Sequence, residues 1–198
     1  MVATKVKTPI TRQLESMLDD TQTQVILKIF DKIGINQWLG KNPFKKITLV
    51  EQSYIANVEV SGWYDYNARE AEISSTKNSD EWGARLEWGK VDKLSHTGRT
   101  ALEAVQFTAI HELGHHIHAE LSKQNALSYK LSFQLPRTNG VSTYAKTPRR
   151  AEEYFAESFA AWVLYRVELS VHDQLGYGMI ERALEALGIE VKEYEFSS

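Results

Sequence analysis

The segment that most constrains this chain is AIHELGHHIH at positions 109–118. It contains the pattern His-Glu-x-x-His within an apolar, helix-forming stretch. Residues four apart lie on one face of a helix, so His111 and His115 would aim two imidazole nitrogens at a single metal ion. Glu112 follows the first of them and would accept a proton from a water molecule at that metal. The motif therefore predicts a helix that carries a zinc site.

The composition limits what else could hold the metal. The chain has 198 residues and no cysteine, so thiolate ligands, disulfides and cysteine nucleophiles are excluded. Any metal must be bound by His, Glu or Asp. A formal net charge of -3 gives no basic surface for nucleic acid, and the length predicts one domain.

The N-terminal segment, residues 1–12, is polar and is followed by no apolar core of a signal peptide. No stretch of the sequence approaches the 18 or so apolar residues of a membrane span. We therefore expect no membrane association and a cytoplasmic location at synthesis. The final location could instead be a virion, or the outside of the cell after secretion by a route that reads no N-terminal signal.

The hydrophobic periodicity predicts helices and strands around the motif. The predicted helices span 9–33 (one or two helices), 100–120, 149–169 and 179–187, the last ended by Gly188 and preceded by breaks at Gly176 and Gly178. The predicted strands span 44–51, 55–63 and 69–75. In the last of these Ala71 and Ile73 alternate with polar residues, as in a half-buried strand. The pattern indicates an α+β fold.

A catalytic zinc site commonly has three protein ligands, so a third donor is required. The metzincin spacing would place it at Leu121, which excludes that class. The helix predicted at 149–169 offers Glu152, Glu153 and Glu157. Glu153 and Glu157 share one face with the small side chains at 156 and 160, which would allow close packing on the motif helix. We assign Glu153 to the zinc, and Glu157 to the second ring N–H of a ligand histidine.

Taken together, three motifs resemble the protease domain of anthrax lethal factor, the Pro-Pro endopeptidases of clostridia, and zincin modules of toxins and phage proteins. They are HELGH at 111–115, STY at 142–144 and EYFAESF at 153–159. The resemblance covers about residues 62–166. It implies a zincin-like catalytic domain at 41–198, with a small mixed sheet and an edge strand over the active-site helix. Residues 1–40 would be an N-terminal arm and helical extension.

The resemblance also implies roles for further residues. Glu153 would be the third zinc ligand and Glu157 the carboxylate behind a ligand. Tyr144 would stabilise the oxyanion of the tetrahedral intermediate, with Tyr129 as the alternative. The strand at 70–75 would be the edge strand that pairs with an extended peptide substrate. The expected function is that of a zinc-dependent endopeptidase with Glu112 as the general base.

Two other functions fit the same motifs. One is a zincin without catalysis that acts as a phage virion, head-assembly or other structural interaction protein. The other is a translocated toxin or effector protease that meets a host protein. Of the remaining histidines near the motif, His116 is expected to face solvent, and His118 to support a ligand or the packing.

Overall fold

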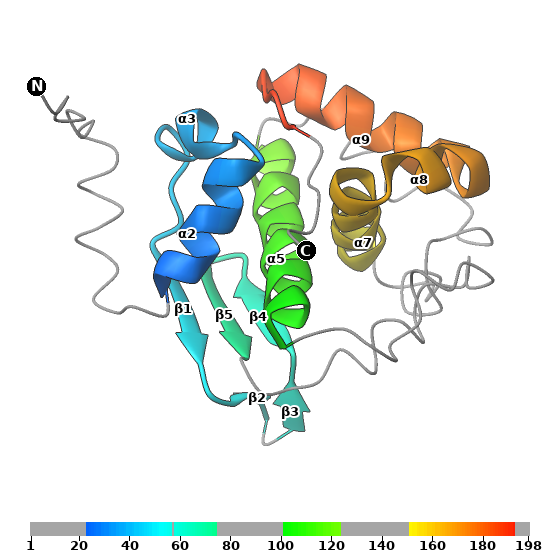
Figure 1. Cartoon of the computed structure of the whole chain (residues 1–198). Coiled ribbons are helices and arrows are strands. Elements are labelled where there is room, and N and C mark those ends of the chain that lie inside the picture. The colour runs from blue at the N-terminus through cyan, green and yellow to red at the C-terminus, as the bar shows by residue number, and fades with distance from the viewer. Residues whose placement is uncertain (1–22, 57, 75–100, 124–150, 193–198) are drawn as a thin grey trace, which may run out of the picture.

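The computed structural model describes residues 23–56, 58–74, 101–123 and 151–192, which form helices and two small sheets (Figure 1). The helices are α2 (Thr23–Lys32), α3 (Asn36–Leu39), α5 (Ala101–Lys123), α7 (Ala151–Leu164), α8 (Arg166–His172) and α9 (Gln174–Leu187). The strands are β1 (Lys46–Val50), β2 (Ser53–Ile55), β3 (Val58–Val60), β4 (Gly62–Asp65) and β5 (Glu70–Ser74). The predicted α+β class is confirmed.

The three-stranded sheet has the order β1-β5-β4, in which β5 is parallel to β1 and antiparallel to β4. Ala71 and Ile73 of β5 are buried, as their alternation predicted. The expectation that β5 is an edge strand open to a substrate is wrong, because β1 and β4 take the hydrogen bonds on its two sides. Within the described sheet the edge strands are β1 and β4.

The segment predicted as one strand at 55–63 contains parts of three strands. β2 and β3 pair with each other as an antiparallel hairpin, and β4 begins at Gly62 in the other sheet. Ala56 has a φ of 49°, which is the left-handed conformation found in tight turns. The reversal there ends β2 early, although the residues around it alternate as in a longer strand.

Helix α5 is the central element of the fold (Figure 1). It packs against α7 on one side and against β4, β5 and α2 on the other. Its residues from 105 to 121 are all buried. A helix enclosed on several sides is not restricted to one apolar stripe, and polar side chains within it are withdrawn from water. The predicted extent of this helix agrees closely with the structure.

The C-terminal helices differ from the prediction at two points. The helix predicted at 149–169 is divided into α7 and α8 at Tyr165, whose φ of -146° and ψ of 50° are not helical. Asp173 caps α9, because its carboxylate accepts the backbone N–H of Gly176 at 2.9 Å. Gly176 and Gly178 therefore both lie inside α9, and the predicted breaks before this helix are wrong. Gly188 ends the helix in the left-handed conformation, as predicted.

Helix α2 confirms the later part of the helical segment predicted at 9–33. Residues 9–22 of that segment lie outside the described residues. Ile26, Ile29 and Phe30 are buried where α2 packs on α5 and β1. The division of the chain at residue 40 stays a prediction. No helix in the described ranges is both long and apolar enough to cross a lipid bilayer.

Candidate metal centre

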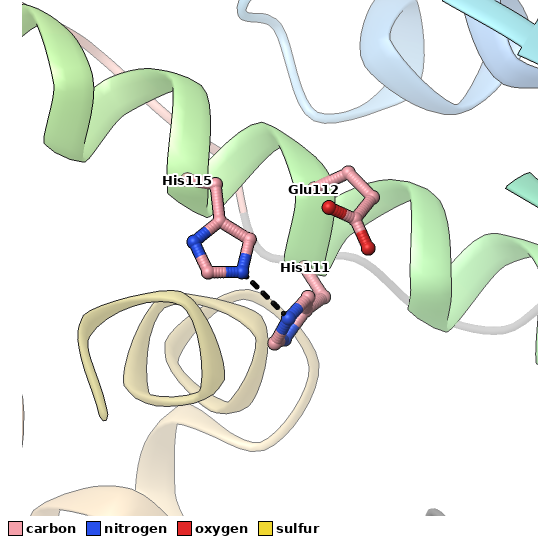
Figure 2. A group of neighbouring side chains, drawn as sticks. All are labelled: His111, Glu112 and His115. Atoms are coloured by element: carbon pink, nitrogen blue, oxygen red, sulfur yellow. Dashed lines mark hydrogen bonds between the residues drawn. The ribbon is translucent and has the colours of Figure 1, made fainter. Parts of the chain in front are cut away.

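His111 and His115 lie one turn apart on α5, and their imidazoles face each other. Their Nε2 atoms are 3.0 Å apart, and both side chains are buried. Figure 2 shows both rings projecting from α5 toward α7, with the Glu112 carboxylate pointing elsewhere. Possible ligand atoms of these three residues all lie within 4.8 Å of one another. The helix thus presents a buried cluster that could bind a metal ion.

Glu153 reaches the same point from α7. Its Oε2 lies 3.3 Å from His111 Nε2 and 3.4 Å from His115 Nε2. The three donor atoms therefore form a nearly equilateral triangle. A tetrahedral zinc ion with bonds of 2.0–2.1 Å separates its ligand atoms by about 3.3 Å. The spacing of the three donors fits such an ion.

The charges of these groups suit a cation. Burial alone would raise the pKa of Glu153, but the adjacent His115 and His111 rings hold it well below its usual range. Burial alone would lower the pKa of His115, yet the nearby carboxylates, Glu153 foremost, raise it overall. Glu153 is thus a carboxylate, the form that binds metals.

Glu112 is buried beside the triangle. Burial raises its pKa to about 8, with the Glu153 charge acting in the same direction and His115 in the opposite one. A carboxylate with a pKa near neutrality can accept and return a proton at physiological pH. Strand β4 lies against this side chain: a Cβ at Gly62 would be 2.9 Å from Glu112 Oε1. Glycine at position 62 therefore lets the edge strand approach the carboxylate closely.

Gly114, inside the motif, lies where α5 meets α7. A Cβ at this position would be 2.8 Å from the Cα of Ala156 and 3.1 Å from its carbonyl oxygen. Both atoms belong to the backbone of α7, which cannot rotate away as a side chain would. The prediction that small residues such as Ala156 allow close helix packing is borne out at this contact. It brings Glu153, one turn earlier on α7, within reach of the two histidines.

We expect Gly114→Ala to lower the free energy of unfolding by about 1–3 kcal/mol, as overpacking of a tight interior does. In an unconstrained helix the same change stabilises by about 0.5–1 kcal/mol. Gly178→Ala in α9 is the matched control, since its Cβ would meet nothing closer than the flexible end of Arg182 at 3.3 Å. Urea unfolding measures both. Equal stabilisation by the two substitutions would contradict the close contact of α5 with α7.

The second ring nitrogen of His115 has a partner that the sequence reasoning missed. The Tyr66 hydroxyl lies 2.8 Å from His115 Nδ1. Tyr66 is in the turn after β4, outside the three sequence motifs and outside the predicted strands. Burial, together with the charges of Glu152 and Glu153, raises the pKa of Tyr66 well above its usual value, so the phenol is neutral.

The other predicted site residues have these positions. Glu157 is fully buried on α7, one turn beyond Glu153. Because Tyr66 occupies His115 Nδ1, the ring N–H left for Glu157 is that of His111, and this role stays a prediction. Tyr144 and its alternative Tyr129 lie outside the described residues.

His116 is fully buried, so the expectation that it faces solvent is wrong. Its Nε2 lies 2.8 Å from the carbonyl oxygen of Asn42, and its Nδ1 lies 2.8 Å from the Tyr64 hydroxyl. Packing of α3 and the segment after it onto α5 encloses the ring, and this burial lowers its pKa to about 4. The sequence of α5 alone does not indicate that the α3 region buries this side of the helix.

His118 is also buried, and its ring is tilted against Phe155 of α7 with centroids 5.0 Å apart. Tyr66 meets it edge-on at 6.3 Å. Burial lowers its pKa to about 3, so the ring is neutral. These contacts agree with the supporting or packing role expected for it.

Comparison of the sequence with models of known protein families gave no match, and no curated protein matched it. The site therefore rests on its own geometry.

Proposed function

We propose that this chain is a zinc-dependent endopeptidase. The observation that carries the proposal is the donor triangle, with sides of 3.0, 3.3 and 3.4 Å, formed by His111, His115 and Glu153. Two imidazoles and one carboxylate are a common ligand set of hydrolytic zinc, which keeps a further position for water or substrate. Glu112 beside this triangle supplies the base that a purely structural metal site does not need.

His111 and His115 would hold the metal from α5, and Glu153 from α7. When bound, zinc would polarise the scissile carbonyl and lower the pKa of a water molecule at the site. Glu112 would take the proton of the attacking water and pass it to the leaving amine. Tyr144 remains our candidate for stabilising the oxyanion, and Glu157 for accepting the ring N–H of His111.

The sheet suggests how a peptide would approach. Among the described strands, β4 is hydrogen-bonded to β5 alone. Its other side would accept an extended peptide as an added strand, close to Glu112 because of Gly62. The substrate strand is therefore β4 in this proposal, in place of the central β5.

The metal is the first thing to measure. We expect elemental analysis of the purified chain to find zinc in stoichiometric amount, and removal by a chelator to lower the melting temperature, because a ligand that binds the native state stabilises it. Zinc added back should restore the melting temperature, whereas magnesium, which prefers oxygen ligands in octahedral geometry, should not. Absence of zinc, with no thermal shift on its addition, would disprove the proposal.

A further inference from the structure

Two tyrosines of β4 and its turn contact two consecutive histidines of α5. The hydroxyl of Tyr64 meets His116, and that of Tyr66 meets His115, each at an oxygen-to-Nδ1 distance of 2.8 Å. The contacts resemble each other, but only His115 belongs to the donor triangle. The two pairs can therefore be compared directly.

The tautomer of His116 is fixed by its partners. The carbonyl oxygen of Asn42 accepts hydrogen bonds and cannot donate them, so the Nε2 that faces it carries the proton. The Nδ1 of His116 then has a lone pair and accepts the hydroxyl hydrogen of Tyr64. Tyr64 thus acts as a donor to a histidine that has no ligand role.

As a zinc ligand, His115 would need the opposite tautomer. Its Nε2 faces the Nε2 of His111 at 3.0 Å and the Oε2 of Glu153 at 3.4 Å. A nitrogen that binds metal must offer a lone pair, so with zinc bound the proton of the neutral ring would lie on Nδ1. That N–H would point to the Tyr66 oxygen, 2.8 Å away, which can accept it. Tyr66 would then be an acceptor where Tyr64 is a donor.

The backbone around Tyr66 is held firmly enough to position a ring. The Asp65 carboxylate accepts the backbone N–H groups of Asn67 at 2.7 Å and Ala68 at 2.8 Å. The N–H of Arg69 donates to the Asp65 carbonyl oxygen at 2.7 Å. The Tyr66 ring packs edge-on against Tyr64, with centroids 5.1 Å apart. The hydroxyl is thus carried by a hydrogen-bonded turn and a packed ring.

We propose that Tyr66 is a positioning residue of the metal centre: its hydroxyl oxygen accepts the Nδ1–H of His115 and holds the imidazole in the tautomer and orientation that present Nε2 to zinc. This inference rests on the proposed zinc site. Partners of ligand histidines act in this way in metal sites generally, and their loss weakens metal binding by about 10- to 100-fold. Here the partner comes from the turn after an edge strand, far from the motif in sequence.

The test compares Tyr66→Phe with Tyr64→Phe, its matched control, by measuring the zinc dissociation constant of each metal-free protein in competition with a chelator. Each variant loses one hydroxyl from the same segment, and both rings remain. We expect Tyr66→Phe to raise the dissociation constant about 10- to 100-fold. Tyr64→Phe should keep the wild-type value, although it leaves His116 Nδ1 without its donor.

Equal dissociation constants for wild type and Tyr66→Phe would overturn the inference while leaving the zinc site intact, and so would equal weakening by both variants. A wild type that binds no zinc would overturn the proposed function as well. If Tyr66→Phe does not fold, NMR of the imidazole nitrogens in the zinc-loaded wild type decides. A protonated Nδ1 on His115, protected from exchange with water, supports the inference, and an unprotonated or freely exchanging Nδ1 overturns it.

Discussion

Glu112→Gln is expected to abolish peptide hydrolysis while the protein keeps its zinc. The amide is nearly the same size as the carboxylate but cannot accept the proton of the attacking water. General base catalysis contributes about 10²- to 10⁴-fold to enzymatic rates, and the loss should be of that order. Because the metal donors in our assignment are His111, His115 and Glu153, the variant should retain stoichiometric zinc. Cleavage of a peptide library, followed by mass spectrometry, would show the products of the wild type and their absence in the variant.

The matched control is Glu120→Gln, which changes another buried glutamate of the same helix. Glu120 pairs with Arg69 at 2.6 Å and with Lys123 at 2.8 Å, away from the donor triangle. The Glu120→Gln substitution should lower the free energy of unfolding and leave the cleavage products unchanged. If Glu112→Gln cleaved the library as the wild type does, Glu112 would not be the base. If neither protein cleaved any peptide although zinc was bound, a structural or virion role for the metal site would become the better hypothesis.

Glu153→Ala is expected to weaken zinc binding by more than about 100-fold. Loss of a residue that merely supports a ligand costs about 10- to 100-fold, and loss of a ligand itself should cost more. The substitution removes the Oε2 that lies 3.3 Å from His111 Nε2 and 3.4 Å from His115 Nε2. Two donors would then remain from the protein. The zinc dissociation constant is measured by competition with a chelator, as for the tyrosine variants.

Glu152→Ala is the control for this prediction, because Glu152 precedes Glu153 on α7 and, like it, is only partly buried. It should leave the zinc dissociation constant nearly unchanged. The opposite result, in which Glu152 matters and Glu153 does not, would mean that α7 is rotated relative to α5. An effect of Glu157→Ala larger than that of Glu153→Ala would mean that the ligand is one helical turn further along.

The parts of the site that the sequence predicted are those set by local geometry. An α-helix fixes the relation of residues four apart, so the pairing of His111 with His115 followed from spacing alone. The approach of Glu153 could also be anticipated, because glutamates and small residues share one face of the next helix. The alternation of Ala71 and Ile73 predicted the buried face of β5 for the same reason: a strand repeats every two residues.

The parts that the sequence did not predict depend on which elements meet. The same alternation is found in a central strand and in an edge strand, so the position of β5 between β1 and β4 was decided by pairing. Likewise the burial of His116 comes from the α3 region that covers α5. No glycine or proline lies near Tyr165, so the sequence did not indicate the break between α7 and α8.

The sequence by itself determined the central helix with its two candidate metal-binding histidines, its candidate base and the α+β class. The tertiary structure decided the environment of those residues: the triangle closed by Glu153, the β4 backbone against Glu112, and the Tyr66 hydroxyl on His115. The physical reason is the distance along the sequence over which each kind of interaction acts. Helical and strand periodicity act over a few residues and can be read along the chain, whereas the partner of a ring nitrogen is chosen by the packing of segments distant in sequence.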